Sequence, residues 1–274
     1  MNGDEMFLEE LKKSHRGLVE VIATILITGL MVTSIALTYF YIVPTIDRGQ
    51  LDSTLSASSL FLTKVDGNVQ SLFNDGLNAS RSLEIDIDAG IFDISNFGVN
   101  IRTYIDGSIW EFIPITIGIV ELTIPSDVAV IERDTIKYIK GDKYFPIVVT
   151  EDGPADPGTI TLERPEADEY KLSLWYRLVL LGEDDGTSIN FSLIVYQFTT
   201  QTGFVGLHDG NYELVIKKQN SSYSSSTTSG DNFRITTQRA TGLETIFTSS
   251  GSRTSINFHL QIITLDFELI TLLA

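Results

Sequence analysis

Residues 12–43 read KKSHRGLVEVIATILITGLMVTSIALTYFYIV, a basic stretch that ends at a glycine and is followed by a long apolar run. The 26 residues of the run, 18–43, carry one charged side chain, that of Glu20. At roughly 1.5 Å per residue, a helix of this length reaches about 39 Å, which is enough to cross a bilayer. Its threonine hydroxyls can bond back to the helix itself. We therefore expect residues 18–43 to form a transmembrane helix.

The charges beside the apolar run predict its orientation. Lys12, Lys13 and Arg16 lie immediately before it, whereas only Arg48 follows it closely. Positively charged flanks stay on the cytoplasmic side of a membrane. The sequence thus predicts a single-pass membrane protein with a cytoplasmic amino terminus and an extracellular carboxy-terminal part.

A secretory signal peptide is the alternative reading of the same run. Ser34-Ile35-Ala36 has the small-x-small pattern of a signal peptidase site. The apolar region would be unusually long, and cleavage there would leave the apolar residues 37–43 as a new amino terminus. We therefore favour the retained anchor.

Arg16-Gly17 and the Val-Ile-Ala-Thr-rich residues behind it resemble the class III signal peptide of archaeal type IV pilin-like proteins. The resemblance implies that a prepilin peptidase cleaves between Gly17 and Leu18, removes residues 1–17 as a cytoplasmic leader and spares the apolar helix. It also implies a subunit of a cell-surface filament or pseudopilus, bulk or minor, that assembles with other pilin-like subunits and has an adhesion-type role.

Glu20 departs from the pattern of the family. It would be the third residue after the cut, whereas bacterial pilins place their glutamate at the fifth, and many archaeal relatives have a Ser-Pro pair where this chain has Val19-Glu20. Its carboxylate either pairs with the free amine of a neighbouring subunit during assembly or lies in the first helical turn, where the helix dipole favours an anion.

A second helical segment is expected over residues 44–77, where Pro44 should end or kink the membrane helix. Polar residues such as Asp66 and Gln70 occupy the other faces of this helix. Its apolar residues recur at three- and four-residue steps, and they are Leu51, Leu55, Leu62, Val65, Val69 and Leu72. This helix stripe can pack on the chain's own sheet or on equivalent helices of other subunits.

From residue 78 the hydrophobic period changes to two, which is typical of half-buried strands. Asp106-Gly107 predicts a tight hairpin, residues 129–132 a short strand, and the Ser/Thr-rich residues 221–229 an exposed loop. The Pro- and acid-rich residues 151–169 predict a long loop or a lobe junction. The expected fold class is α+β, with a long amino-terminal helix followed by an antiparallel β-sandwich-like domain over 78–274.

Composition excludes several classes of function. The chain of 274 residues has a net charge of −17, which argues against nucleic-acid binding, and it has no cysteine for disulfides or thiolate metal sites. His15, His208 and His259 are far apart in sequence, and no catalytic or phosphate-binding motif is present. We expect no enzymatic activity and no cofactor.

Two further sets of residues have a functional and a simpler interpretation. The acidic clusters Asp86/Asp88, Glu151/Asp152/Asp156 and 183–185 could bind calcium, but their spacing is not that of a calcium loop, and a solvated acidic surface explains them as well. Three asparagines fit the glycosylation pattern, although two or three matches are expected by chance: Asn78, Asn190 and Asn220.

The sequence therefore favours a pilin-like structural subunit. The alternative is an uncleaved single-pass membrane protein whose β domain binds a ligand or partner, and in that case the helix stripe would pack wholly on its own domain.

Overall fold

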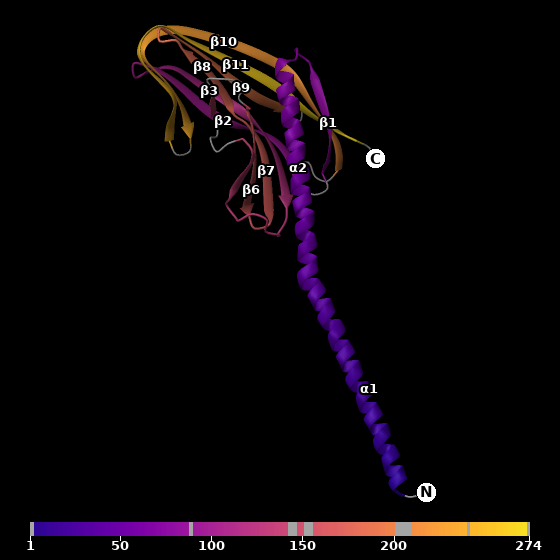
Figure 1. The fold of residues 1–274 in the computed structure, drawn as a ribbon. Coiled ribbons are helices and arrows are strands. Elements are labelled where there is room, and N and C mark those ends of the chain that lie inside the picture. Colours follow the sequence, from indigo (N-terminus) through magenta and orange to yellow (C-terminus); the bar gives the residue numbers. More distant parts are fainter. Residues whose placement is uncertain are drawn as a thin grey trace. The chain divides into compact units, whose positions relative to one another are not determined.

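The computed structural model describes residues 3–87, 90–141, 147–150, 156–200, 210–239 and 242–272. The chain divides into two compact units after Ser53. Helices begin the chain and strands make up the rest of it (Figure 1). The expected α+β class, a long apolar amino-terminal helix followed by a mostly antiparallel β domain, is confirmed.

The helical part consists of α1 (Gly3–Leu37), a π-helical turn η1 (Thr38–Ile42) and α2 (Val43–Asn74). Pro44 does not end the helix, contrary to one of our two expectations. A proline lacks the N–H that would bond to the carbonyl four residues earlier, and helices absorb such a gap by local widening. The π-helical turn ends at Ile42, two residues before Pro44, and the Thr45 hydroxyl donates to the Tyr41 carbonyl at 2.7 Å.

The described strands of the second unit form one eleven-stranded sheet. Along the sheet their order is β4-β6-β7-β3-β2-β10-β11-β9-β8-β5, and β1 pairs with β10 outside this path. The strands are β1 (Ser80–Ile87), β2 (Ile91–Ile105), β3 (Ser108–Pro125), β4 (Ile136–Lys140), β5 (Ile147–Thr150), β6 (Gly158–Glu166), β7 (Glu169–Tyr176), β8 (Leu178–Asp184), β9 (Ser188–Thr200), β10 (Gly210–Arg239) and β11 (Gly242–Thr271).

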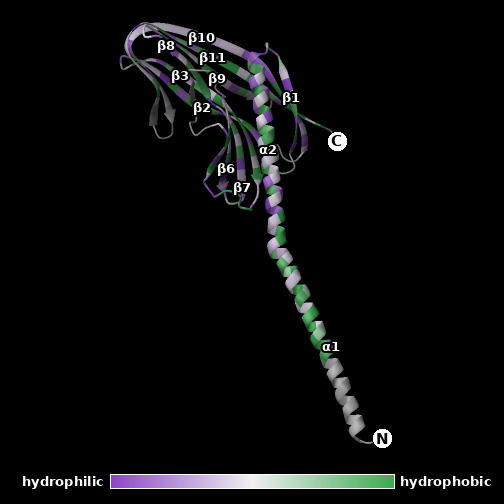
Figure 2. Cartoon of the chain, viewed as in Figure 1, coloured by the Kyte–Doolittle hydropathy of each residue, from purple (hydrophilic) through white to green (hydrophobic). Residues whose placement is uncertain are grey.

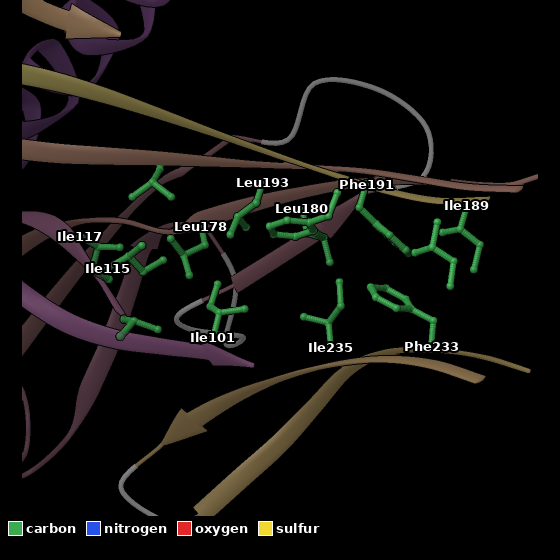
Figure 3. Packing of buried hydrophobic residues seen from close by; sticks show 14 residues of the cluster. Ile101, Ile115, Ile117, Leu178, Leu180, Ile189, Phe191, Leu193, Phe233 and Ile235 are labelled. Atoms are coloured by element: carbon green, nitrogen blue, oxygen red, sulfur yellow. The ribbon is translucent and has the colours of Figure 1, made fainter. Parts of the chain in front are cut away.

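Most neighbouring strands are antiparallel, but β9 is parallel to β11 and β5 is parallel to β8. Part of the sheet folds over the rest and encloses a hydrophobic core. Figure 3 shows Ile101, Phe233 and Ile235 pointing toward Ile189 and Phe191 between two layers of strands. The Phe191 and Phe233 rings stack with centroids 5.1 Å apart, so the core joins β9 to the distal part of β10.

The hairpin predicted at Asp106-Gly107 is confirmed. It joins β2 to β3, and its two turn residues have positive φ values of 48° and 81°. That conformation suits glycine and is tolerated by aspartate. The Asp106 carboxylate also accepts a hydrogen bond from the Asn232 amide nitrogen at 3.0 Å, which fixes the turn beside β10.

The prediction of a loop at residues 221–229 is wrong, because these residues are part of β10. Ser222, Ser224 and Ser226 are opposite Ile262, Leu260 and Phe258 of β11. Pairing with β11 gives hydrogen-bond partners to the backbone N–H and C=O groups of this segment, and this pairing does not depend on its serine-rich composition. Its side chains remain largely exposed.

The strand predicted at residues 129–132 is also wrong. Side chains rather than a neighbouring strand satisfy the backbone of this segment. The Tyr170 hydroxyl bonds to both the Val128 carbonyl and the Val130 amide at 2.7 Å, and Arg164 donates to the Ile131 carbonyl at 3.3 Å. Of the residues 151–169, those from 151 to 155 lie outside the described residues, and most of the others form β6 and the start of β7.

Candidate functional site

The amino-terminal helix contains the segment that sequence analysis assigned to a membrane. It is the one described helix that is long and apolar enough to cross a bilayer, and its most apolar window has a mean hydropathy of 2.2 with no residue buried. From residue 19 to residue 50 every side chain is exposed except that of Ala36, which is half-buried. Figure 2 shows this part of the helix as predominantly hydrophobic. An all-round apolar surface of this length fits a lipid environment.

The predicted processing residues lie inside α1. Lys12, Lys13, Arg16, Gly17 and Leu18 all have helical backbone. Proteolysis needs an extended substrate, so cleavage at this bond requires local unwinding of the helix. Glycine is among the poorest helix formers, which makes such unwinding less costly here than at most residues.

Glu20 is exposed on α1, one turn after the predicted cut. The Thr24 hydroxyl donates to the Glu20 backbone carbonyl at 2.8 Å, and Thr33 and Thr38 bond in the same way to Gly29 and Ser34. The expectation that the threonines of the apolar run bond back to the helix is confirmed for these three. Each hydroxyl is thereby satisfied without water, as an apolar environment demands.

The helix stripe is buried. Exposed fractions are 6% for Leu51, 7% for Leu55 and 0% for Leu62, Val65, Val69 and Leu72. Ser58 lies on the same face and is 8% exposed. Within the second unit the Phe61 ring packs edge-on against Phe92 of β2 at 6.0 Å. Of the two partners left open, the chain's own sheet thus occupies the stripe from Leu55 to Leu72.

A lysine that no sequence pattern singled out binds the carboxy-terminal end of α2. Lys218 of β10 is 6% exposed, and its ammonium donates to the backbone carbonyls of Phe73 and Asp75 at 2.8 Å each. Helix ends leave carbonyls without partners and carry a partial negative charge. A buried cation at this position gives the carbonyls a donor and balances the partial negative charge. It also links the helix end to β10.

Asp66 belongs to the polar faces of the helix, yet its side chain is only 1% exposed. The Tyr176 hydroxyl donates to Asp66 Oδ1 at 2.6 Å, and the Lys140 ammonium contacts Asp66 Oδ2. The same ammonium lies 2.7 Å from Oδ2 of Asp156. A buried carboxylate requires such partners, and the helical period alone does not reveal them.

Charge and burial set the proton equilibria of this cluster. Burial lowers the pKa of Lys140, but the bonds to Asp156 and Asp66 outweigh this, so the pKa of Lys140 is raised overall. Burial, followed by the nearby Asp66 carboxylate, raises the pKa of Tyr176, which keeps its phenol protonated. Burial also raises the pKa of Tyr196, whose ring is 5.2 Å from that of Tyr176.

The remaining candidate residues are dispersed. Asp184 pairs with Arg253 at 3.0 Å, and Asp185 accepts bonds from Thr187 and Ser188 within its own turn. Asp88, Glu151, Asp152 and His208 fall outside the described residues, as does the side chain of His15. His259 Nδ1 is 2.5 Å from the Tyr223 hydroxyl. Within the part of the chain that is described, no three acidic or histidine side chains gather as metal ligands would.

The three glycosylation candidates are all exposed. Asn78 lies in the turn after α2 with a positive φ of 66°, Asn190 lies on β9, and Asn220 lies on β10 next to a bulge. The Asn190 side-chain oxygen accepts a bond from Asn257 at 2.7 Å.

Comparison with known proteins gives no relative: no family model, curated protein or solved structure matches this chain.

Proposed function

We propose that this chain is a pilin-like subunit of a membrane-derived surface filament, anchored by residues 18–43 and carrying an extracellular β domain. One observation carries the proposal. A single run of helix has an apolar part that is exposed on all sides and a later part whose apolar stripe is used by the chain's own sheet. The exposed part can serve first lipid and then neighbouring helices, while the buried part keeps the domain attached.

The Arg16-Gly17 junction supports the same proposal from the sequence. A cut after Gly17 removes the charged leader and leaves the anchor complete. The lysines and arginine of the leader hold it at the anionic inner leaflet, on the side of the membrane where a prepilin peptidase cuts. A cut after the helix would instead release the domain from the membrane.

Co-expression with a prepilin peptidase tests the processing step. The wild-type chain and Gly29→Val, a control glycine in the same helix with open space around it, should both lose residues 1–17. Gly17→Val should stay at full length, because the peptidase no longer accepts the residue before the cut. Equal processing of the two variants would contradict the proposal.

Burial of the helix stripe also suits the alternative, an uncleaved membrane protein whose β domain binds a ligand or partner. Electron microscopy of surface filaments, combined with mass spectrometry of their subunits, separates the two. The proposed function requires this chain within a filament. A chain found only in the membrane, at its full length, would favour the alternative.

A further inference from the structure

A lysine and two aspartates meet where α2 lies beside the end of β4. Asp66 comes from the helix, Lys140 is the last residue of β4, and Asp156 lies just before β6. The Lys140 ammonium contacts one carboxylate and is 2.7 Å from the other. The amine therefore lies against the carboxyl group of Asp66, and such proximity favours a condensation between the two groups.

The environment of this pair differs from that of an ordinary surface ion pair. The Asp66 side chain is 1% exposed, and it accepts a hydrogen bond from the hydroxyl of the fully buried Tyr176. The contacts with Asp156 and Asp66 favour the ammonium, so the reaction proceeds from the minor form in which one proton has passed from the ammonium to the carboxylate and a neutral amine lies beside a neutral acid. Lys140 itself is 28% exposed, which leaves a route by which a water molecule can depart.

We propose that Lys140 and Asp66 join spontaneously in an intramolecular isopeptide bond, with Asp156 as the proton carrier. The inference goes beyond filament assembly and does not depend on it.

The reaction balances without an external reagent. The neutral Lys140 amine attacks the carboxyl carbon of protonated Asp66, which forms the Nζ–Cγ bond. Asp156 takes one proton from the attacking nitrogen and passes it to Oδ2 of Asp66. The Cγ–Oδ2 bond then breaks and one water leaves. The product is an amide and an Asp156 carboxylate, so the net charge of the three groups is unchanged.

Neighbouring groups favour this step. The Tyr176 hydroxyl, 2.6 Å from Asp66 Oδ1, donates to the oxygen that gains negative charge during attack and becomes the amide oxygen. The Gln70 side-chain nitrogen lies 3.0 Å from Asp66 Oδ2 and 2.8 Å from Asp156 Oδ1, so it aligns the two acids. A side chain at Gly158 would overlap Asp66, which makes the glycine a requirement for this close approach.

The bond would tie α2 to β4, a strand at the end of the sheet order. The helix is the element through which the chain passes from the apolar segment to the sheet. A covalent link at Asp66 would transmit force from the helix into the sheet without relying on the stripe alone. A subunit held in a filament would gain resistance to pulling.

Peptide mass spectrometry of the full-length chain tests the proposal, with the protein purified from a host that lacks prepilin peptidase. After denaturation and trypsin digestion, residues 65–81 should be found joined to residues 138–143, at a mass one water below the sum of the two. Trypsin cannot cleave after a lysine in an amide, so the second peptide runs through Lys140. Recovery of residues 65–81 and 138–140 as separate, unmodified peptides would overturn the proposal.

Variants then assign the roles. Lys140→Arg keeps the positive charge, but its guanidinium is not a nucleophile, so the linked peptide should vanish. Asp156→Asn should reduce the linked fraction at least tenfold, and an unchanged fraction would refute its role as proton carrier. Lys171→Arg is the matched control, because Lys171 pairs with Glu121 at 2.7 Å in the same sheet, with side chains 34% and 15% exposed. The linked fraction should be unaffected there.

Discussion

The two parts of the amino-terminal helix have similar apolar side chains and opposite environments. Between residues 19 and 46, large hydrophobic residues are exposed around the whole helix, as in Leu30 at 71% and Met31 at 60%. Between residues 54 and 72 the apolar residues of the helix stripe keep to one face and are almost completely buried, whereas Leu60 on another face is 56% exposed. The arrangement of apolar residues around the helix, more than their number, separates a surface for lipid from a surface for protein.

The largest expected effect is the loss of membrane insertion when charges are placed in the exposed part of the helix. Replacing both Ile27 and Leu30 by arginine costs about 2.5–3.5 kcal/mol per residue at the centre of a membrane helix. The double variant should leave the alkali-resistant membrane fraction, whereas Ile27→Ala with Leu30→Ala should remain in it. A double arginine variant that stays in the membrane would remove the distinction between the two parts.

The buried part offers a matched pair of leucines. Leu62 is fully buried and Leu60, two residues before it, is 56% exposed. Leu62→Ala should lower the free energy of unfolding by about 2–5 kcal/mol, because it leaves a cavity. Leu60→Ala should change it little. Chemical denaturation of the purified chain measures both, and equal losses would show that the stripe does not hold the helix to the sheet.

The attachment of the helix end is tested by two adjacent lysines. Lys218 is buried and bonds to two helix carbonyls, while Lys217 is exposed. Lys218→Met should reduce the free energy of unfolding by about 1–3 kcal/mol, since the two carbonyls at the helix end lose their charged donor. Lys217→Met is the control and should have little effect. If Lys217→Met were the more damaging variant, the capping role would be wrong.

The smallest expected effect is on the pH dependence of stability, and it should be confined to the β domain. Hydrogen bonds from Arg253, and then from Ser249, lower the pKa of Asp184 from 3.8 to about 2. Since the pKa in the folded state lies below that in the unfolded state, the stabilisation is present above about pH 4 and is lost as the pH falls toward 2. The stability of Asp184→Asn should change less over this range. Urea melts at several pH values compare the two, and identical pH profiles would contradict the assignment.

Local patterns predicted the elements whose structure depends on neighbouring residues in the sequence. The three- and four-residue period located the buried stripe, and Asp106-Gly107 located its hairpin, because helical spacing and turn conformation are local properties. The serine-rich residues 221–229 were misassigned because their backbone partners lie on β11, some forty residues away.

The burial of polar groups was the other feature that could not be predicted from the sequence. Asp66 occupies a helical position next to the stripe, and its burial depends on Lys140 and Tyr176, which are distant in the chain. Lys218 was likewise unremarkable until the fold brought it to the end of α2. The burial of such groups depends on contacts with residues distant in the chain, and the hydrophobic period does not predict these contacts.

The mature amino terminus of the chain, determined by mass spectrometry on material from its own cell surface, tests the central claim most directly. The exposed apolar part of the helix, kept intact behind a charged leader, predicts a mature chain that starts at Leu18. A chain that starts at Met1, or one cut within the helix so that it starts at Leu37, would contradict it.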